Sequence, residues 1–120
     1  MVSATDTRTQ IEQAVRRFEE EVPALGRLKL VMRLELLARG DVPTWRVELP
    51  GPSVSKDPAR DARVDVSVAR PAFNELAREG RLEDWVRAYE RGQIKVSGDS
   101  GVVRLVGSVI ERQRQRARSR

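Results

Sequence analysis

The chain has 120 residues with neither cysteine nor histidine, which leaves room for one compact domain but excludes disulfides, thiolate or imidazole metal sites and histidine-assisted catalysis. Its formal net charge of +5 is concentrated at one end, because residues 111–120 contain five arginines and one glutamate. The first 110 residues, with 18 basic and 17 acidic groups, are nearly neutral. We therefore expect one domain over residues 1–111 and a basic carboxyl-terminal tail over 112–120.

Apolar residues recur at helical spacing near the amino terminus. Ile11, Ala14, Val15 and Phe18 fall on one side of a helix, which predicts an amphipathic helix over about residues 7–21. Proline at the following position 23 is expected to end that helix.

The apolar spacing then changes to every second residue, as in a strand with one apolar face. Residues 28–36 show this alternation most clearly, and residues 45–49 repeat it after a turn at 38–43, so we predict a hairpin. Residues 53–55 are typical of a short edge strand, and 64–68 alternate as a further full strand.

The second half of the chain returns to helical spacing, with a first helix over 71–80 and a second, shorter one over 82–92. Residues 94–96 predict the last strand, and 102–110 give the final helix a broad apolar face. The order is helix, three or four strands, two helices, strand, helix. Because strands adjacent in sequence prefer to pair antiparallel, we predict an α+β fold with a mainly antiparallel sheet covered by helices.

The stretch SGDSG at residues 97–101 contains the tetrapeptide that surrounds the nucleophilic serine of chymotrypsin-like proteases. Ser100 has no histidine to accept its proton, so this chemistry lacks its base. We interpret the stretch as a strand that ends at Gly98, followed by Asp99 or Ser100 as the cap of the next helix. The sequence shows no other catalytic arrangement, and we expect a protein that is not an enzyme.

Three stretches carry a resemblance to a known family: TWRVELPGPSVS (44–55), ARVDVSVARPAFNELAREGRL (62–82) and YERGQIKVSGDSGVVRLVGSVI (89–110). They resemble the sterol carrier protein type-two family of small lipid-binding domains. The last stretch is the most specific, with an aromatic-x-x-Gly pattern, a strand, a Gly-Asp turn and a closing apolar helix. Together with the strand at 28–36, the resemblance covers residues 7–110 and implies a five-stranded sheet with helices around an apolar tunnel.

The resemblance implies a non-catalytic carrier that holds a lipid or another hydrophobic ligand in this tunnel, without a cofactor or a metal. The alternative is an accessory or scaffold protein that binds a partner protein, for example by presenting an isoprenoid-type intermediate to a biosynthetic enzyme. The candidate ligand-binding residues are the apolar residues of the matching helices and strands, namely Met32, Leu34, Phe73, Leu76, Trp85, Val86, Tyr89, Val102, Val106, Val109 and Ile110.

The charge distribution also bears on partners and location. Alternating arginines and small polar residues in the tail are typical of a solvated helix end or a disordered terminus, and the alternative is peripheral contact with an anionic membrane. The aromatic residues occupy apolar positions instead of a basic face, which argues against nucleic acid binding. The first ten residues lack the apolar core of a signal peptide, and no uncharged stretch is long enough to cross a bilayer. We expect a cytoplasmic protein.

Overall fold

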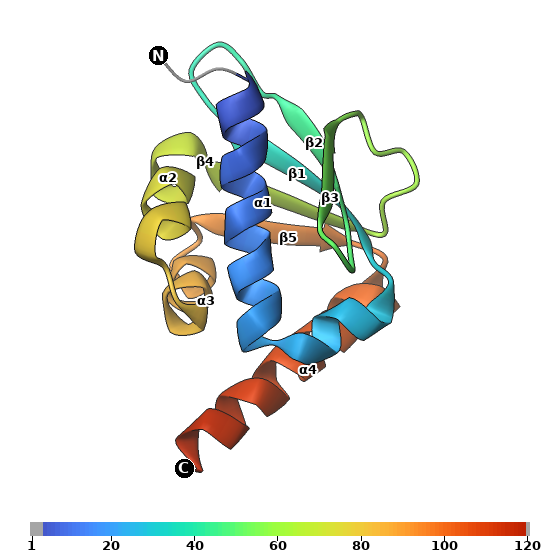
Figure 1. The fold of residues 1–120 in the computed structure, drawn as a ribbon, viewed down its shortest axis with the longest axis vertical. Coiled ribbons are helices and arrows are strands. Elements are labelled where there is room, and N and C mark those ends of the chain that lie inside the picture. The colour runs from blue at the N-terminus through green and yellow to red at the C-terminus, as the bar shows by residue number, and fades with distance from the viewer. Residues whose placement is uncertain (1–3, 120) are drawn as a thin grey trace.

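The computed structural model describes residues 4–119, which form two layers: a five-stranded sheet and a set of helices that covers one of its faces (Figure 1). In chain order, the elements are α1 (Ala4–Glu21), the 3-10 helix η1 (Pro23–Leu28), β1 (Val31–Leu37), β2 (Thr44–Glu48), β3 (Ser53–Lys56), β4 (Val64–Ala69), α2 (Arg70–Glu79), α3 (Leu82–Glu90), β5 (Ile94–Gly98) and α4 (Ser100–Arg118). The predicted α+β class and the order of elements are confirmed.

The sheet has the strand order β3-β2-β1-β4-β5 and is mixed. β1 pairs antiparallel with β2, β2 with β3, and β4 with β5, but β1 and β4 are parallel, with Met32 opposite Val64. The prediction of a mainly antiparallel sheet is therefore corrected. After β3, the chain passes through residues 57–63 to the other side of β1 and enters β4 in the direction of β1.

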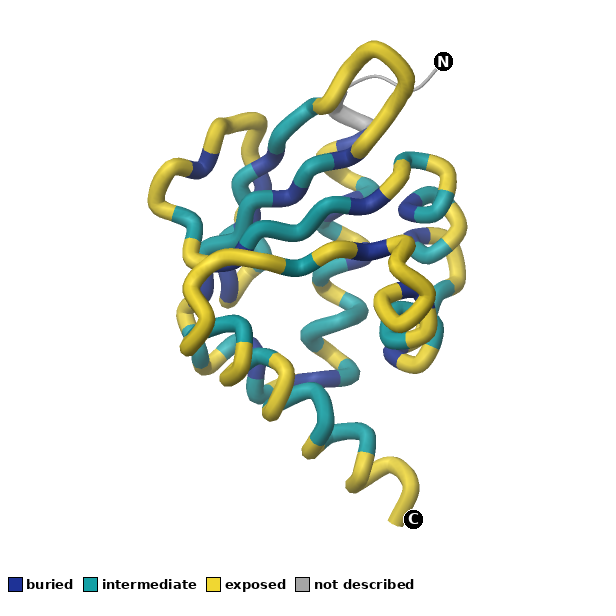
Figure 2. Tube along the Cα trace, turned by 180° about the vertical axis from the view of Figure 1, so that it is seen from behind, coloured by how far each residue is buried: buried dark blue, intermediate teal, exposed yellow. Residues whose placement is uncertain are grey.

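The period-two pattern of the strands separates a buried face of the sheet from a polar one. Leu36 and Val68, which are register partners on β1 and β4, are 0% and 1% exposed on the face under the helices. Arg33 and Asp65, partners on the same two strands, form an ion pair at 3.4 Å on the opposite face. Figure 2 shows the molecule from behind, with α1 seen beyond the strands and α4 below them.

The helices differ in how deeply they pack. α1 lies along the sheet and buries Ile11 and Ala14, whereas α4 contributes no fully buried residue. α4 contacts β5 and η1 and runs along the lower edge of the molecule in Figure 1. In the part of the chain that the structure describes, no helix combines the length and apolarity needed to span a membrane.

Two boundaries differ from the sequence prediction. The first strand begins at residue 31, not at 28, because residues 23–28 form η1 and Lys29 turns the chain with a left-handed φ of 48°. The closing helix continues to residue 118, so the described arginines of the predicted tail are helical and follow directly on its apolar part.

The SGDSG stretch is the turn between β5 and α4. β5 ends at Gly98, and the Asp99 side chain caps α4 by accepting a hydrogen bond from the Val102 amide at 3.1 Å. Gly98 has a φ of +122°, and a Cβ atom at this position would lie 2.4 Å from the carbonyl oxygen of Arg63. Only glycine therefore fits here, and the turn brings α4 back over the sheet.

Candidate ligand cavity

A cavity of about 410 Å³ lies between the covered face of the sheet and the helices. This volume is within the range of small-molecule binding sites, roughly 300 to 1,000 Å³. On the sheet side, all the lining residues from the strands and their flanking positions are apolar: Leu30, Met32, Leu34, Val47, Leu49, Val64, Val66, Val68, Ile94 and Val96.

The exposure of neighbouring strand residues marks where the helices leave the sheet uncovered. Met32 and Val66 line the cavity from β1 and β4, two neighbouring inner strands, yet both remain partly accessible. Leu36 and Val68, further along the same strands and on the same face, are buried. A well-packed core would bury all four side chains, so the helices and the sheet do not meet at this point.

Three aromatic rings form one wall of the cavity, each from a different helix. Trp85 on α3 makes edge-to-face contacts with Phe18 on α1, at 6.1 Å between ring centroids, and with Phe73 on α2, at 6.2 Å. All three rings line the cavity. Since such pairs have a preferred geometry, they fix the relative positions of α1, α2 and α3 while leaving the space beside them open.

α4 completes the cavity, with Val103, Val106, Gly107 and Ile110 toward it. One turn after Ile110, the Arg114 guanidinium is hydrogen-bonded on three nitrogens. Its Nε and Nη2 donate to the carboxylate of Glu83 on α3 at 2.8 and 3.0 Å, and its Nη1 donates to Glu111 at 2.9 Å.

The contacts between Arg114 and Glu83 also shift the pKa values of both side chains. The hydrogen bonds from Arg114 hold the pKa of Glu83 below its ordinary value, and the same bonds raise the pKa of Arg114. Both side chains are therefore charged at neutral pH, and an ion pair joins α4 to α3 beside the cavity.

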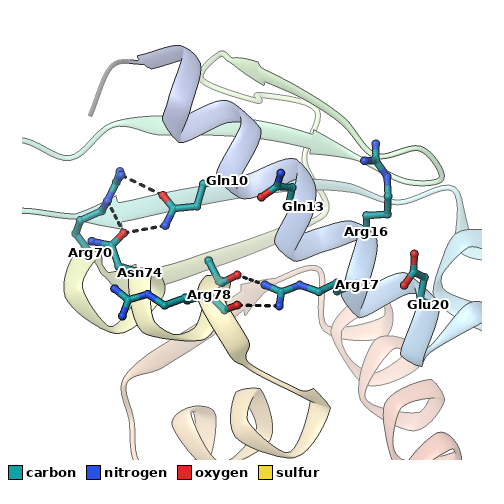
Figure 3. A pocket seen from close by; sticks show the side chains of 9 residues that line it. Gln10, Gln13, Arg16, Arg17, Glu20, Arg70, Asn74 and Arg78 are labelled. Carbon is teal, nitrogen blue, oxygen red and sulfur yellow. Dashed lines mark hydrogen bonds between the residues drawn. The ribbon is translucent and has the colours of Figure 1, made fainter. Parts of the chain in front are cut away.

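A second, larger concavity of about 730 Å³ lies on the outer side of α1 and α2, and three of its polar side chains, Gln10, Arg70 and Asn74, bond to one another (Figure 3). Asn74 Oδ1 accepts hydrogen bonds from Gln10 at 3.3 Å and from Arg70 at 3.0 Å. Arg17 donates to the backbone carbonyls of Ala77 and Arg78 at the end of α2. These bonds join two helices, and we interpret this surface as a helix contact.

Comparison with known proteins rests on the fold, because no family model and no curated protein matches the sequence. The crystal structure of sterol carrier protein 2 like 2 from Aedes aegypti superposes with a TM-score of 0.57 at 22% identity, covering 88% of this chain and 97% of that one. An NMR structure of palmitated SCP2L2 from the same organism gives 0.56 at 21%, covering 83% and 93%. The chain has the sterol carrier protein 2 fold.

Two further solved structures resemble this chain in fold. Sterol carrier protein 2 from Yarrowia lipolytica in its apo form matches with a TM-score of 0.55 at 15% identity, covering 81% of this chain and 87% of that one. UbiJ-SCP2, described as a ubiquinone synthesis protein, matches with 0.54 at 21%, covering 95% and 96%. The sterol carrier protein 2 fold thus accounts for nearly the whole chain.

Most of the candidate ligand-binding residues come together in this sterol carrier protein 2 fold. Eight of them line the cavity: Met32, Leu34, Phe73, Trp85, Val86, Tyr89, Val106 and Ile110. Leu76, Val102 and Val109 do not line it and pack against the core instead. Contact of any of these side chains with a ligand remains a prediction.

The charged residues that line the cavity, above all Arg114, were not among the residues predicted from the sequence. It was assigned to the solvated tail because it stands among other arginines. The available signal was its spacing: Val103, Val106 and Ile110 recur at three and four residues, and position 114 continues that series. Helical periodicity would have placed this arginine on the same face as the cavity-lining residues of α4.

Proposed function

We propose that this protein is a non-catalytic carrier that holds a lipid or another hydrophobic molecule in the cavity between sheet and helices. The observation that carries the proposal is the unfilled space of about 410 Å³ over an entirely apolar sheet face. Further support comes from the palmitated form in which a protein of the same fold, SCP2L2 from Aedes aegypti, was solved.

The energetics of such a site are favourable. Enclosing roughly 400 Å² of lipid surface at about 25 cal/mol per Å² contributes on the order of 10 kcal/mol before the costs of immobilising the ligand. After those costs, we expect a micromolar dissociation constant. A ligand can enter or leave only if a helix moves away from the cavity. We expect α4 to be that helix, because none of its residues is fully buried and its displacement therefore exposes little core surface.

The basic end of α4 supplies a means of docking where ligand is loaded. Arg112, Arg116 and Arg118 are exposed, while Arg114 between them is held in its ion pairs. Near an anionic membrane each free arginine contributes about 1 kcal/mol. We propose that these three residues hold the protein at a membrane surface while a lipid enters or leaves. The cytoplasmic location expected from the sequence stays a prediction.

The carrier function is tested by the content of the protein as purified. We expect native mass spectrometry to show a bound molecule, and organic extraction to release a lipid. The delipidated protein should then bind N-phenyl-1-naphthylamine, an uncharged fluorescent probe, with one site. A protein that carries no lipid and does not bind the probe would contradict the carrier function.

A second candidate function is an accessory role beside a biosynthetic enzyme, and its support is the match to UbiJ-SCP2, a ubiquinone synthesis protein, over 95% of this chain. In this role the cavity would present an isoprenoid-type intermediate to a partner enzyme. The same extraction separates the two functions: a defined isoprenoid as the only extracted lipid supports the accessory role, whereas a mixture of acyl lipids supports the carrier.

A further inference from the structure

The residues that line the cavity differ in how far solvent reaches them. Toward η1 the cavity is closed: Leu25, Leu30 and Leu49 are at most 4% exposed, and the Leu49 amide donates to the Leu30 carbonyl at 2.7 Å. On α3 and α4, by contrast, no lining residue is fully buried. The lining residues that are exposed all belong to these two helices, namely Tyr89 and Glu90 on α3 and Gly107 on α4. The cavity therefore reaches the surface between α3 and α4.

Three consecutive elements border this opening. α3 leads to β5, β5 leads to α4, and all three contribute lining residues. β5 is the lowest strand in Figure 2, and α4 passes below it. Both helices contact β5 but scarcely contact each other. Among residues 4–119, the only hydrogen bonds between the two helices are those from Arg114 to Glu83. The opening is thus three-sided, and this ion pair closes the corner away from β5.

Tyr89 is the largest exposed side chain at this border. It lines the cavity although 55% of its surface is exposed, so it belongs to the cavity and to the outer surface. Trp85 on the same helix is held by two aromatic contacts, whereas among the described residues no hydrogen bond or ring contact fixes the Tyr89 side chain. Exposed side chains change rotamer within nanoseconds. The Tyr89 ring can therefore cover or clear the opening while α3 stays folded.

We propose that ligands enter and leave between α3 and α4, and that the Tyr89 ring partly blocks this route. The proposal rests on the carrier function and names the path by which the cavity is loaded. It also gives the direction in which α4 moves, which is away from α3 while its contact with η1 is kept. An obstructing side chain raises the barrier to entry and to exit alike. Tyr89 should therefore control the rates of exchange and not the affinity.

Substitutions at Tyr89 test its role. In Tyr89→Ala we expect the association and dissociation rate constants of N-phenyl-1-naphthylamine to rise together by about three- to tenfold, with a nearly unchanged dissociation constant. Stopped-flow fluorescence measures both rates. Tyr89→Phe keeps the ring and should exchange at the original rate. Leu105→Ala is the control, because Leu105 is also apolar and 48% exposed but does not line the cavity.

Blocking the opening tests the route itself. Since the chain contains no cysteine, Tyr89→Cys and Arg27→Cys each carry a single thiol. The first lies at the proposed opening, and the second lies on η1 at the closed end, exposed and outside the cavity lining. Both are then labelled with polyethylene glycol maleimide. We expect the label at position 89 to slow probe exchange about fivefold or more, and the label at position 27 to leave it unchanged.

The outcomes separate the route from the function. A label at position 27 that slows exchange as much as the label at position 89, or more, would overturn the route and leave the carrier function standing. If Tyr89→Ala raises only the dissociation rate and so weakens binding, Tyr89 is a ligand contact and its role in the route is overturned. If the probe does not bind the unmodified protein, the carrier function fails, and the route fails with it.

Discussion

Arg114 on α4 donates two hydrogen bonds to the carboxylate of Glu83 on α3, at 2.8 and 3.0 Å. The arginine side chain is only 16% exposed, whereas that of the glutamate is 53% exposed. An ion pair with one partner in solvent adds little to stability, about 0–1 kcal/mol. Its position matters more than its strength, because α4 cannot move away from α3 without breaking it.

Removing this contact should speed ligand exchange more than it lowers stability. For Glu83→Gln we expect the dissociation rate of a bound lipid to rise by roughly two- to fivefold, the equivalent of an exposed ion pair. This dissociation rate is measured by stopped-flow fluorescence as N-phenyl-1-naphthylamine leaves the protein. Arg8→Gln, which breaks an exposed ion pair within α1, is the control. An equal acceleration in both variants would contradict the idea that the ion pair between Arg114 and Glu83 holds α4 against α3.

Acid should open the same contact. The pKa of Glu83 is lowered, first by its hydrogen bond from Arg114 and then by the attraction of Arg114, Arg118 and Arg87, with burial opposing. A carboxyl group with a lowered pKa stabilises the folded arrangement above its ordinary value, and this stabilisation is lost as pH falls through the lowered pKa. We therefore expect probe release to accelerate below about pH 4.5. In Glu83→Gln this acceleration should be reduced, and an unchanged pH profile would contradict the assignment.

Filling the cavity should remove binding without unfolding the protein. A Cβ atom at Gly107 would meet nothing within 4 Å, and replacing a helical glycine favours the helix by up to about 1 kcal/mol. Gly107→Leu should therefore keep or raise the melting temperature while weakening lipid binding at least tenfold. Ser108→Leu, on the exposed side of α4, should bind normally. If Gly107→Leu bound lipid as tightly as the unmodified protein, the ligand would have to lie outside this cavity.

The turn before α4 should tolerate no side chain. Gly98→Ala would force a Cβ atom to 2.4 Å from the Arg63 carbonyl oxygen at a φ of +122°, and strained positions of this kind cost about 1–3 kcal/mol before any clash. Gly92→Ala is the matched control, since its φ is +79° and no atom lies within 4 Å of the new Cβ. Urea unfolding should show the larger loss for Gly98→Ala, and equal losses would argue against the clash.

The exposed arginines of α4 should govern membrane attachment. Replacing Arg112, Arg116 and Arg118 with glutamine leaves Arg114 and its ion pairs in place, which a deletion of the tail would not. We expect the triple variant to bind vesicles containing phosphatidylserine at least tenfold more weakly, from about 1 kcal/mol per arginine. Probe binding should not change. Equal vesicle binding by both proteins would rule out docking through this helix.

The sequence predicted the elements because their signals are local. Alternation at residues 45–49 and 64–68 depends only on neighbours in the chain, and both strands lie within one residue of the prediction. The parallel pairing of β1 with β4 is not local: it depends on the path of residues 57–63 across the end of the sheet. Periodicity carries no information about such a path, which is why the sheet was expected to be mainly antiparallel.

The cavity could be predicted only in part, for a similar reason. Met32 and Leu36 occupy the same face of β1 and look alike in the sequence, yet one lies beside open space and the other is fully buried. The difference depends on how far the helices stand from each part of the sheet. Arg114 was missed because a charged residue in a charged segment appears solvated until a partner on another helix, here Glu83, is known.

All the described helices lie on one face of the sheet, and this arrangement has a practical use. Since the sequence contains no cysteine, a Glu35→Cys variant would carry a single thiol on the face away from the cavity. The protein could then be fixed to a gold or maleimide surface in one orientation, with α4 directed outward. Molecules anchored in this way would form a uniform layer for detecting the ligand in solution.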